Sequence, residues 1–487
     1  MSKHDVQPIR SRVIKAYDIR GVVPDDLDAD LVRDVGAAFA ELTSPPDGGS
    51  HPGVIVGRDA RSSSPELATA FTDGATSRGA PVVDIGLAST DMLYFAAGSL
   101  DLPGAMITAS HNPGRYNGVK LCRAGAIPVG RDSGLAEIAA AVDASAVDAS
   151  AVDASASVAP GSVAPGSVAP AQVPPRSVTQ RDVLPGYVEY LHRLVPLDAS
   201  RDITVAVDAG NGMAGLTVPA VLADTPVTVD GLYLELDGSF PNHPADPLDS
   251  ANLVDLQRRV LETGADLGLA FDGDADRCFV VDEAGALVDP SAITALIAVR
   301  ELQRHPGASI IHNLITSRAV PEVVREHGGV PVRTRVGHSF IKARMAETQA
   351  VFGGEHSGHF YFADFWRADS GMLAALHVLA ALGETPVGTR LSELVGRYQR
   401  YARSGEINSV VASPRAVMDA VRARYGPRQG VTLDDLDGLT VAGPDWWFNV
   451  RPSNTEPLLR LNVEARDPDT MGAVRDEVLD FVAAHRE

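Results

Sequence analysis

An alternation of strand and helix patterns most constrains what this chain of 487 residues can fold into. Short apolar runs that suit buried strands, GVIVG at 53–57 and APVVDIG at 80–86, lie among helical patterns. The alternation starts again at 202–212 (DITVAVDAGNG) and once more at 308–314 (ASIIHNL). Three such starts predict three similar α/β units.

The last part of the chain has a different order of elements. A strand pattern, SVVAS at 409–413, is followed by a helical pattern at 414–425, a strand pattern at 458–466 and a final helix. This order predicts a smaller α+β domain at the end of the chain.

Two runs of low complexity follow the first unit. Residues 142–156 repeat one five-residue unit, and residues 157–171 repeat another that contains Pro and Gly. Such runs bury too little apolar surface to offset the entropy of ordering, so we predict a flexible linker here. The predicted organisation is domain I at 1–142, a linker at 143–178, domain II at 179–287, domain III at 288–400 and domain IV at 401–487.

The charge balance limits the partners. With 42 basic and 63 acidic residues the net charge is −21, so we expect neither nucleic acid nor a membrane as a partner. No apolar run reaches the roughly 18 residues of a membrane span, and the N-terminus lacks the apolar core of a signal peptide. Two cysteines exclude a disulfide framework. We expect a cytoplasmic monomer or homodimer, in which a phosphorylated substrate would need a local basic pocket.

Three aspartates follow an apolar strand pattern in LGLAFDGDADRCFVV. Asp272, Asp274 and Asp276 occupy alternate positions, which can turn their carboxylates toward one point, where they repel one another without a cation. Hard oxygen ligands of this kind suit Mg²⁺. One alternative is an Asp-rich turn that only caps the strand. An EF-hand is the other, and Arg277 argues against it because that loop needs glycine there.

Two further loops carry polar groups at close spacing. GEHSGH offers Glu355, Ser357 and His359 at alternate positions, which suits sugar hydroxyls, and His359 can also move a proton. RPSNTEP combines Arg451 with short donors and loop amides that can hold a phosphate. Taken alone, each loop is also compatible with an ordinary hydrogen-bonded turn.

The serine in TASHNPGRYNGVK stands directly before a histidine. Adjacent side chains on a turn tend to diverge, so an ordinary Ser-His-Asp triad of Ser110 and His111 is not expected, and no G-x-S-x-G elbow surrounds the serine. A serine can instead carry a phosphoryl group when a metal neutralises the phosphoryl oxygens. The aspartate loop would hold that metal, and Lys120 would neutralise charge or assist proton transfer.

Arginines follow short apolar runs near the N-terminus, in KAYDIRGVVP and VGRDARSSSP. Arg20 is a candidate to face a phosphate. Arg58 and Arg61 are expected to pair with Asp59 or to cap the following helix.

Taken together, TASHNP, DGDADR, GEHSGH and RPSNTEP resemble the serine, metal, sugar and phosphate loops of the α-D-phosphohexomutase superfamily, most closely its bacterial phosphomannomutase/phosphoglucomutase group. YDIRG near the N-terminus and TRVGHSFIK at 334–342 also fit, and the order holds across nearly the whole chain. The resemblance implies three similar α/β domains and a C-terminal α+β domain of the TATA-box-binding-protein-like type, arranged around a central cleft.

The resemblance also implies an activity, the interconversion of mannose 1-phosphate and mannose 6-phosphate, and of the glucose phosphates. Ser110 would be phosphorylated in the resting enzyme, with Mg²⁺ held by Asp272, Asp274, Asp276 and a phosphoserine oxygen. The phosphoryl group would pass to a hexose phosphate to give a hexose 1,6-bisphosphate, which reorients and returns its other phosphate to Ser110.

Residue roles follow from the same resemblance, position by position. The implied catalytic residues are Ser110, His111, Lys120, Arg20, Arg277 and His359. The implied sugar-binding residues are Tyr17, Gly337, His338, Glu355, Ser357 and His359. The implied phosphate-binding residues are Arg451, Ser453, Asn454 and Thr455.

Two departures and three alternatives accompany the resemblance. Ile315 in HNLITSRAV stands where some members carry lysine, so one substrate contact is expected to differ, and the long linker is expected to be dispensable. Three alternative functions remain open.

Within the family, the alternative is a phosphoglucosamine mutase. Outside the family, the alternatives are an aspartyl-phosphate phosphatase with Asp272 as nucleophile and a phosphosugar-binding protein without activity. In a mutase, domain IV is expected to close over the cleft when ligand binds.

Overall fold

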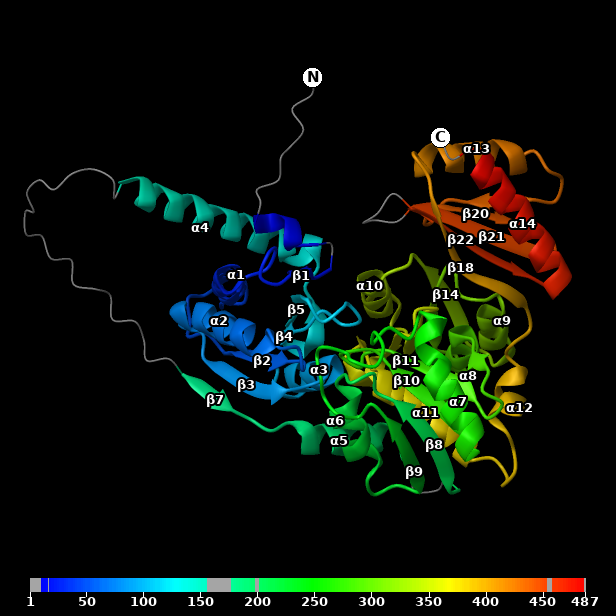
Figure 1. Ribbon diagram of the computed structural model, residues 1–487, viewed down its shortest axis with the longest axis horizontal. Coiled ribbons are helices and arrows are strands. Elements are labelled where there is room, and N and C mark those ends of the chain that lie inside the picture. Colours follow the sequence, from blue (N-terminus) through cyan, green and yellow to red (C-terminus); the bar gives the residue numbers. More distant parts are fainter. Residues whose placement is uncertain (1–9, 16, 156–176, 198–200, 453–457, 486–487) are drawn as a thin grey trace, which may run out of the picture.

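Four sheets, one in each of four domains, follow one another along the chain (Figure 1). The computed structural model describes residues 10–15, 17–155, 177–197, 201–452 and 458–485. Most of the predicted linker, residues 156–176, therefore lies outside the described residues. In Figure 1 domain I and domain IV stand on opposite sides of the molecule, with domains II and III joining them.

Domain I is built on a mixed sheet with strand order β1-β5-β4-β2-β3-β7 and with β6 beside β5. β2 pairs in parallel with β3 and β4, whereas β5 runs antiparallel to β1 and β4. The strands are β1 (Ile19–Val22), β2 (Val54–Arg58), β3 (Val82–Leu87), β4 (Gly104–Ile107), β5 (Tyr116–Arg123), β6 (Ile127–Pro128) and β7 (Val178–Gln180). The helices are α1 (Ala29–Leu42), α2 (Ser64–Ser77), α3 (Thr90–Ser99) and α4 (Leu135–Ser155), with short 3-10 helices η1 (Arg10–Val13), η2 (Ala124–Ala126) and η3 (Arg131–Ser133).

Domain II repeats the arrangement with strand order β12-β11-β10-β8-β9. β10 pairs in parallel with β8 and antiparallel with β11, and all five of its residues are buried. The strands are β8 (Ile203–Asp208), β9 (Val227–Leu232), β10 (Leu267–Phe271), β11 (Cys278–Asp282) and β12 (Leu287–Val288). The helices are α5 (Leu184–Leu194), α6 (Ala214–Leu222), η4 (Ser250–Leu253) and α7 (Val254–Thr263).

Domain III has strand order β14-β13-β15-β16-β17, in which β13 lies parallel to β14 and β15. The strands are β13 (Ser309–Asn313), β14 (Val330–Thr334), β15 (Phe352–Gly354), β16 (Phe360–Phe362) and β17 (Ala368–Asp369). The helices are α8 (Pro290–Arg304), α9 (Ala319–Glu326), α10 (His338–Thr348), η5 (Ala363–Phe365), α11 (Gly371–Gly383) and α12 (Leu391–Gly396).

Domain IV is an antiparallel sheet with strand order β18-β22-β21-β20-β19, accompanied by two helices. Three α/β domains followed by an α+β domain confirm the predicted fold class. The elements are β18 (Ala402–Val410), α13 (Pro414–Tyr425), β19 (Thr432–Asp434), β20 (Leu439–Ala442), β21 (Trp446–Pro452), β22 (Leu458–Ala465) and α14 (Pro468–Ala484).

One continuous hydrophobic core joins domains I, II and III, with Phe95, Tyr187, Phe271 and Leu376 among its members. Smaller clusters lie within domain I, domain II and domain III. Domain IV has a core of its own, and a small cluster that includes Ile315 and Trp447 lies where it meets domain III. Because apolar burial is the main source of cohesion, the shared core joins domains I to III more extensively than domain IV is joined to domain III.

The predicted bounds of the linker are wrong at both ends. α4 continues through the repeats to Ser155, because alanine has the highest helix propensity and the repeats contain no Pro or Gly. The first turns of α4 are anchored in the core of domain I by Leu135, Ile138 and Val142. No helix among the described residues, α4 included, is long and apolar enough to cross a membrane.

At the other end of the linker, β7 extends the sheet of domain I. It pairs in parallel with β3 at the edge of that sheet, with Val178 opposite Val82. Residues 179 and 180, which the sequence pattern placed in domain II, therefore complete domain I. The chain then enters domain II through α5.

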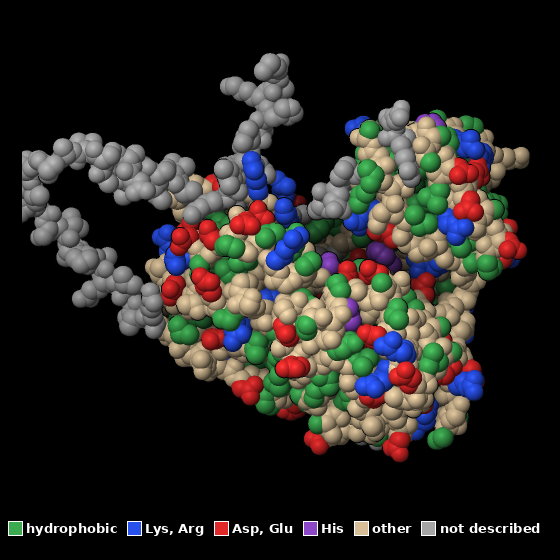
Figure 2. Space-filling view, in the orientation of Figure 1, with side chains coloured by type: hydrophobic (Ala, Val, Ile, Leu, Met, Phe, Trp, Pro, Cys, Tyr) green, Lys and Arg blue, Asp and Glu red, His purple; other side chains and the backbone are tan. Residues whose placement is uncertain are grey.

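A hollow opens between domain I and domain IV in the space-filling view (Figure 2). Acidic and histidine side chains are visible on its floor. The sequence-predicted loops that the structure describes lie at the ends of the strands that face this opening.

Candidate active site

Ser110 lies in the loop between β4 and β5. It is buried, and its backbone has φ 52°, in the left-handed region that a non-glycine residue adopts only when its surroundings hold it there. Its amide donates to Thr108 Oγ1 at 2.9 Å. Its Oγ donates to Asp272 Oδ2 at 2.8 Å, so the serine of domain I contacts the aspartate loop of domain II directly.

The aspartate loop connects β10 to β11, as predicted, and its three carboxylates converge. Asp272, Asp274 and Asp276 are buried, and each offers an oxygen within 4.8 Å of the other two. Burial and repulsion from the other two aspartates raise the pKa of Asp272 well above its ordinary value. Burial acts on Asp274 and Asp276 in the same direction, but the pKa of both is lowered, because Lys120 acts together with the Thr90 hydrogen bond on Asp274 and with His359 and Arg277 on Asp276.

The three carboxylates fit a hard cation. Asp274 Oδ1 and Asp276 Oδ1 are buried and have no hydrogen-bond partner among the described residues. Buried polar atoms almost always have a hydrogen-bond partner. Two unpaired carboxylate oxygens that lie close together therefore indicate a site for a cation. An all-oxygen set of carboxylates is the donor chemistry that Mg²⁺ prefers.

The other oxygens of Asp274 and Asp276 are held by domain I. Lys120 Nζ, on β5, lies 2.7 Å from Asp274 Oδ2 and 2.6 Å from Asp276 Oδ2. Thr90, the first residue of α3, donates its hydroxyl to Asp274 Oδ2 at 2.6 Å and its amide to the Asp274 carbonyl at 2.9 Å. The orientation of the aspartate loop is therefore fixed from outside its own domain. No motif in the sequence indicated that Thr90 contributes to this site.

His111 lies close to Ser110, contrary to the expectation that the two side chains diverge. Ser110 Oγ and His111 Nδ1 are 3.2 Å apart. However, Arg277 Nη2 donates to the same Nδ1 at 2.5 Å, and burial together with Arg277 lowers the pKa of His111 well below its ordinary value. The lone pair on Nδ1 is thus occupied by an arginine that stays protonated, so His111 is not a general base for Ser110.

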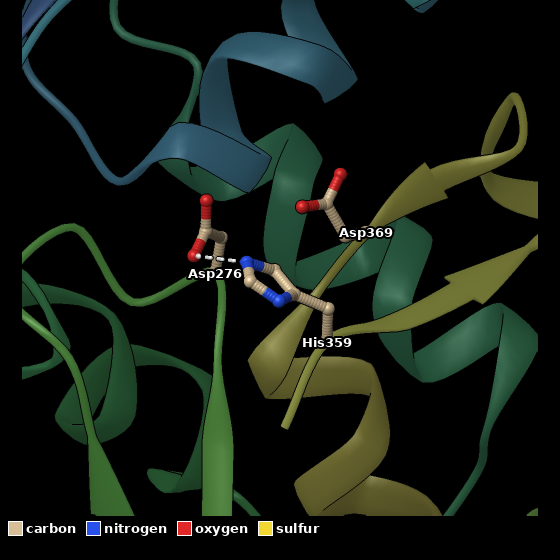
Figure 3. Close-up of side chains that lie close together, drawn as sticks. All are labelled: Asp276, His359 and Asp369. Carbon is tan, nitrogen blue, oxygen red and sulfur yellow. Dashed lines mark ion pairs between the residues drawn. The ribbon is translucent and has the colours of Figure 1, made fainter. Parts of the chain in front are cut away.

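His359 faces the aspartate loop from domain III (Figure 3). Its Nε2 lies 3.6 Å from Asp276 Oδ1, Asp369 lies on the other side of the ring, and Ser357 Oγ is 2.9 Å from its Nδ1. A β-bridge between His359 and Arg277 ties the sugar loop to the aspartate loop. Burial and the Arg277 charge lower the pKa of His359, which therefore stays neutral and able to accept a proton at neutral pH.

Asp369 is a further acidic residue at this point that the motifs did not include. Its carboxylate forms an ion pair with Lys342 Nζ at 2.6 Å, and both side chains are buried. Lys342 belongs to the TRVGHSFIK segment, and its ammonium lies 4.3 Å from the centre of the Tyr94 ring. The pair joins domain III to α3 of domain I.

Glu355 organises the rest of the sugar loop. Its Oε1 accepts from Asn313 Nδ2 at 3.1 Å and from the Gly337 amide at 3.2 Å, and its Oε2 accepts from the Tyr361 hydroxyl at 2.8 Å. The carboxylate therefore connects the ends of β13 and β15 to the start of α10. The Tyr17 hydroxyl, from domain I, lies 3.3 Å from where a Cβ on Gly337 would stand, which brings these two predicted residues together. The side chain of His338 is not among the described ones.

Arg451 extends from β21 in domain IV. Its Nη2 donates to Glu406 Oε2 at 2.6 Å, and Arg460 Nη1 lies 3.4 Å from the other oxygen of Glu406. Burial, then Arg451 and Arg403, lower the pKa of His356 in the sugar loop well below its ordinary value, which places the positive charge of domain IV near that loop. Ser453, Asn454 and Thr455 lie outside the described residues.

Two other predicted positions have clear surroundings. Arg20, on β1, donates to Asn112 Oδ1 at 2.5 Å and to Asp18 Oδ2 at 2.6 Å, so it braces the serine loop. The Ile315 side chain is fully buried and packs in the cluster that contains Trp447.

Arg61 pairs with Asp59, as expected, at 3.0 Å. It also contacts the serine loop, and nothing in the sequence around Arg61 indicated this contact. Ser110 lies 49 positions further along the chain, and the contact depends on how β2 and β4 lie side by side.

Comparison with known proteins agrees with these features. Four family models match the chain in order along its length. They are phosphoglucomutase/phosphomannomutase alpha/beta/alpha domain I at residues 11–147, domain II at 185–285, domain III at 289–401 and the C-terminal domain at 406–481.

Curated relatives and a solved structure match over nearly full length. The chain is 39% identical over 455 residues to the phosphohexose mutases of Xanthomonas campestris pv. campestris (strain B100), covering 93% of this chain and 94% of that protein. It is 37% identical over 476 residues to a phosphomannomutase of Salmonella montevideo, covering 96% and 98%. A phosphoglucomutase/phosphomannomutase family protein from Burkholderia thailandensis superposes with a TM-score of 0.82 at 33% identity, covering 97% of each chain. The chain therefore belongs to the phosphoglucomutase/phosphomannomutase family.

Proposed function

We propose that this protein is a phosphohexomutase that interconverts mannose 1-phosphate and mannose 6-phosphate, and also the corresponding glucose phosphates, through a phosphoserine at Ser110. The observation that carries the proposal is the contact of Ser110 Oγ with Asp272 at 2.8 Å, inside a cluster of three carboxylates that fits a divalent cation. A serine in this position is both a phosphoryl acceptor and a phosphoryl donor. Relatives named phosphomannomutase or phosphohexose mutase support the substrate class.

Asp272, Asp274 and Asp276, with a phosphoryl oxygen on Ser110, would hold Mg²⁺. When bound, the ion supplies the charge that neutralises the phosphoryl oxygens and makes phosphorus open to attack. The protein's own contribution is to hold the carboxylates at one point and to keep Lys120 beside them. In the first half-reaction the phosphorus–oxygen bond to Ser110 breaks as a bond to a sugar hydroxyl oxygen forms.

The proton of that sugar hydroxyl needs an acceptor in the cleft. His359, neutral and 3.6 Å from Asp276, is the best placed group, and it returns the proton when the second phosphate goes back to Ser110. Lys120 would give a proton to Ser110 Oγ as that oxygen leaves phosphorus, and would take it back when Ser110 attacks the second phosphate. Arg20 would balance negative charge on the phosphoryl group. Arg277 would hold the phosphoserine from the side, where it now contacts His111 and Asp272.

Substrate orientation would be set by the loops of domains III and IV. Glu355 and Ser357 suit sugar hydroxyls, with Tyr17, Gly337 and His338 alongside. Arg451, with Ser453, Asn454 and Thr455, would hold the phosphate that does not react. Because the intermediate must turn over without leaving, we expect domain IV, which has its own core, to close over the cleft and to reopen.

The test is turnover of mannose 1-phosphate, glucose 1-phosphate and glucosamine 1-phosphate side by side, with Mg²⁺, a trace of hexose 1,6-bisphosphate as activator, and Ser110→Ala as the control variant. Conversion to the 6-phosphates that is lost in Ser110→Ala supports the serine relay, and the relative rates identify the preferred sugar. Free phosphate as the sole product, with the variant still active, would show that another nucleophile, such as Asp272, does the chemistry.

A further inference from the structure

Arg61 lies beneath the serine loop with its side chain fully enclosed. All five of its N–H donors are used. Nε donates to Asp59 Oδ2 at 3.0 Å, and the other four donors go to backbone carbonyls of a single loop. These carbonyls are Ser110 O at 2.7 Å, Asn112 O at 2.7 Å, Pro113 O at 2.8 Å and Tyr116 O at 3.1 Å.

This arrangement determines the shape of the loop that carries the serine. Four carbonyls within seven residues point toward one centre, which a free turn would not adopt, because carbonyl dipoles aligned on one point repel one another. A buried carbonyl also needs a donor, and Arg61 supplies all four. The left-handed backbone of Ser110 belongs to the same conformation, since its carbonyl is one of the four.

Arg61 is also pressed against domain II. The ring of Phe240 lies 4.9 Å from the guanidinium carbon. Gly238 approaches so closely that a Cβ there would stand 2.2 Å from Arg61 Cα. The guanidinium therefore connects the serine loop on one side with the 237–240 segment of domain II on the other.

We propose that Arg61 is a positioning residue for phosphoryl transfer, an inference that rests on the proposed serine relay. Ser110 gains and loses a phosphoryl group in every cycle, so the charge beside the loop changes each time. Arg61 has no donor left for a phosphate, and its partners are carbonyls whose charge stays constant. It keeps the loop backbone, and with it Ser110 Oγ, in one place in both states, whereas Arg277 and His111 must change partners.

The proposal makes a sharp distinction between arginine and lysine. Lysine keeps the charge, but its compact ammonium has three donors and cannot reach four carbonyls and a carboxylate at once. Arg61→Lys should therefore impair transfer although the charge is conserved. A small displacement of a reacting atom costs roughly ten- to a hundredfold in rate.

The experiment compares Arg61→Lys with Arg78→Lys, an exposed arginine of the same domain that pairs with Glu41. We expect Arg61→Lys to lower kcat about tenfold or more with KM for the hexose phosphate unchanged. We also expect it to move the ³¹P resonance of the phosphoserine and to shorten the lifetime of the phosphoenzyme. Arg78→Lys should match the wild type in all four measurements.

A folded Arg61→Lys protein with wild-type kcat, ³¹P resonance and phosphoenzyme lifetime would overturn the proposal, as would a defect confined to KM. If that variant does not fold, Phe240→Leu decides, because it removes the ring beside the guanidinium and keeps an apolar side chain. It should show the same changes to a smaller degree, and unchanged values would again overturn the proposal. Absence of a phosphoserine in the wild type would refute the serine relay itself, whatever the Arg61 variants do.

Discussion

Lys120 Nζ on β5 of domain I lies 2.7 Å from Asp274 Oδ2 in the aspartate loop of domain II. The same ammonium is 2.6 Å from Asp276 Oδ2. One cation from a neighbouring domain therefore compensates two of three buried carboxylates, and the third accepts the hydrogen bond from Ser110. A divalent ion at this point would share that task with Lys120.

This sharing predicts the behaviour of Lys120→Met. Without the ammonium, two buried carboxylates lose their charge partner, so the Mg²⁺-free protein should be destabilised by about 3–5 kcal/mol. Added Mg²⁺ should then raise the melting temperature of the variant more than that of the wild type, as differential scanning calorimetry can measure. Lys15→Met is the control, because the Lys15 ammonium donates to the Arg12 carbonyl and lies far along the chain from the aspartate loop. An equal Mg²⁺ shift in all three proteins would contradict the prediction.

The raised pKa of Asp272 predicts the acid side of the pH–rate profile. Below that pKa the carboxyl is protonated, and it cannot serve as an anionic ligand for the cation. As the pH is lowered, activity should therefore begin to fall at a pH above the range in which ordinary carboxyl groups titrate. Mg²⁺ favours the ionised form, so a higher Mg²⁺ concentration should move the fall to lower pH. The measurement is kcat/KM against pH at two Mg²⁺ concentrations and constant ionic strength, and a fall at the same pH in both would exclude Asp272 as its cause.

Asp91 predicts a pH dependence of stability. Hydroxyls of Ser89, Tyr187 and Ser370, from three parts of the chain, donate to its carboxylate, yet burial raises its pKa from 3.8 to about 6. A carboxyl whose pKa is raised by folding contributes its stability below the unfolded value and loses it as pH rises through the folded one. Between pH 5 and pH 8 this loss is about 1–1.5 kcal/mol.

Asp91→Asn removes this titration. The melting temperature of the variant relative to the wild type should therefore rise by about one to two degrees between pH 5 and pH 8. Asp101→Asn, at an exposed position of the same domain, should show a constant difference. A constant difference for Asp91→Asn as well would mean that Asp91 stays ionised throughout this range.

The contacts of Arg403 predict how domain IV is held against domain III. From the first strand of domain IV it donates to both oxygens of Asp289, at 2.6 and 2.7 Å, and to the Ile315 carbonyl at 2.7 Å in domain III. Arg403→Met leaves these acceptors without their donor, so domain IV should sample wider openings. We expect KM for the hexose phosphate to rise about tenfold, with a smaller change in kcat, and the radius of gyration by X-ray scattering to increase. Arg400→Met, which removes ion pairs with Glu322 and Glu326, should leave both unchanged.

Much of the site could be predicted because its chemistry is local in sequence. Alternate spacing after a strand was enough to bring three carboxylates together, and the helical pattern at 414–425 matches α13. The low complexity of the repeats predicts disorder, but their alanine content also favours a helix, and in α4 the helix propensity prevails.

Contacts between distant segments could not be predicted. Arg61 and Ser110, or Asp91 and Ser370, meet only because strands pair and domains dock in a particular way. No spacing rule applies across such separations. The closeness of His111 to Ser110 was also missed, because a left-handed serine changes where neighbouring side chains point.

At two points glycines bring the backbones of domains I and II into close contact, and this has a consequence for exchanging domains between relatives. A Cβ on Gly273 would stand 2.4 Å from Ser110 O, and one on Gly114 would stand 2.6 Å from Gly238 O. At these points there is no side chain whose rotamer could change to fit a different neighbour. We therefore expect a chimaera that takes only one of the first two domains from a relative to pack poorly where these glycines meet the other domain. Domain IV contacts domain III through side chains such as those of Arg403 and Trp447, so we expect it to tolerate such an exchange better.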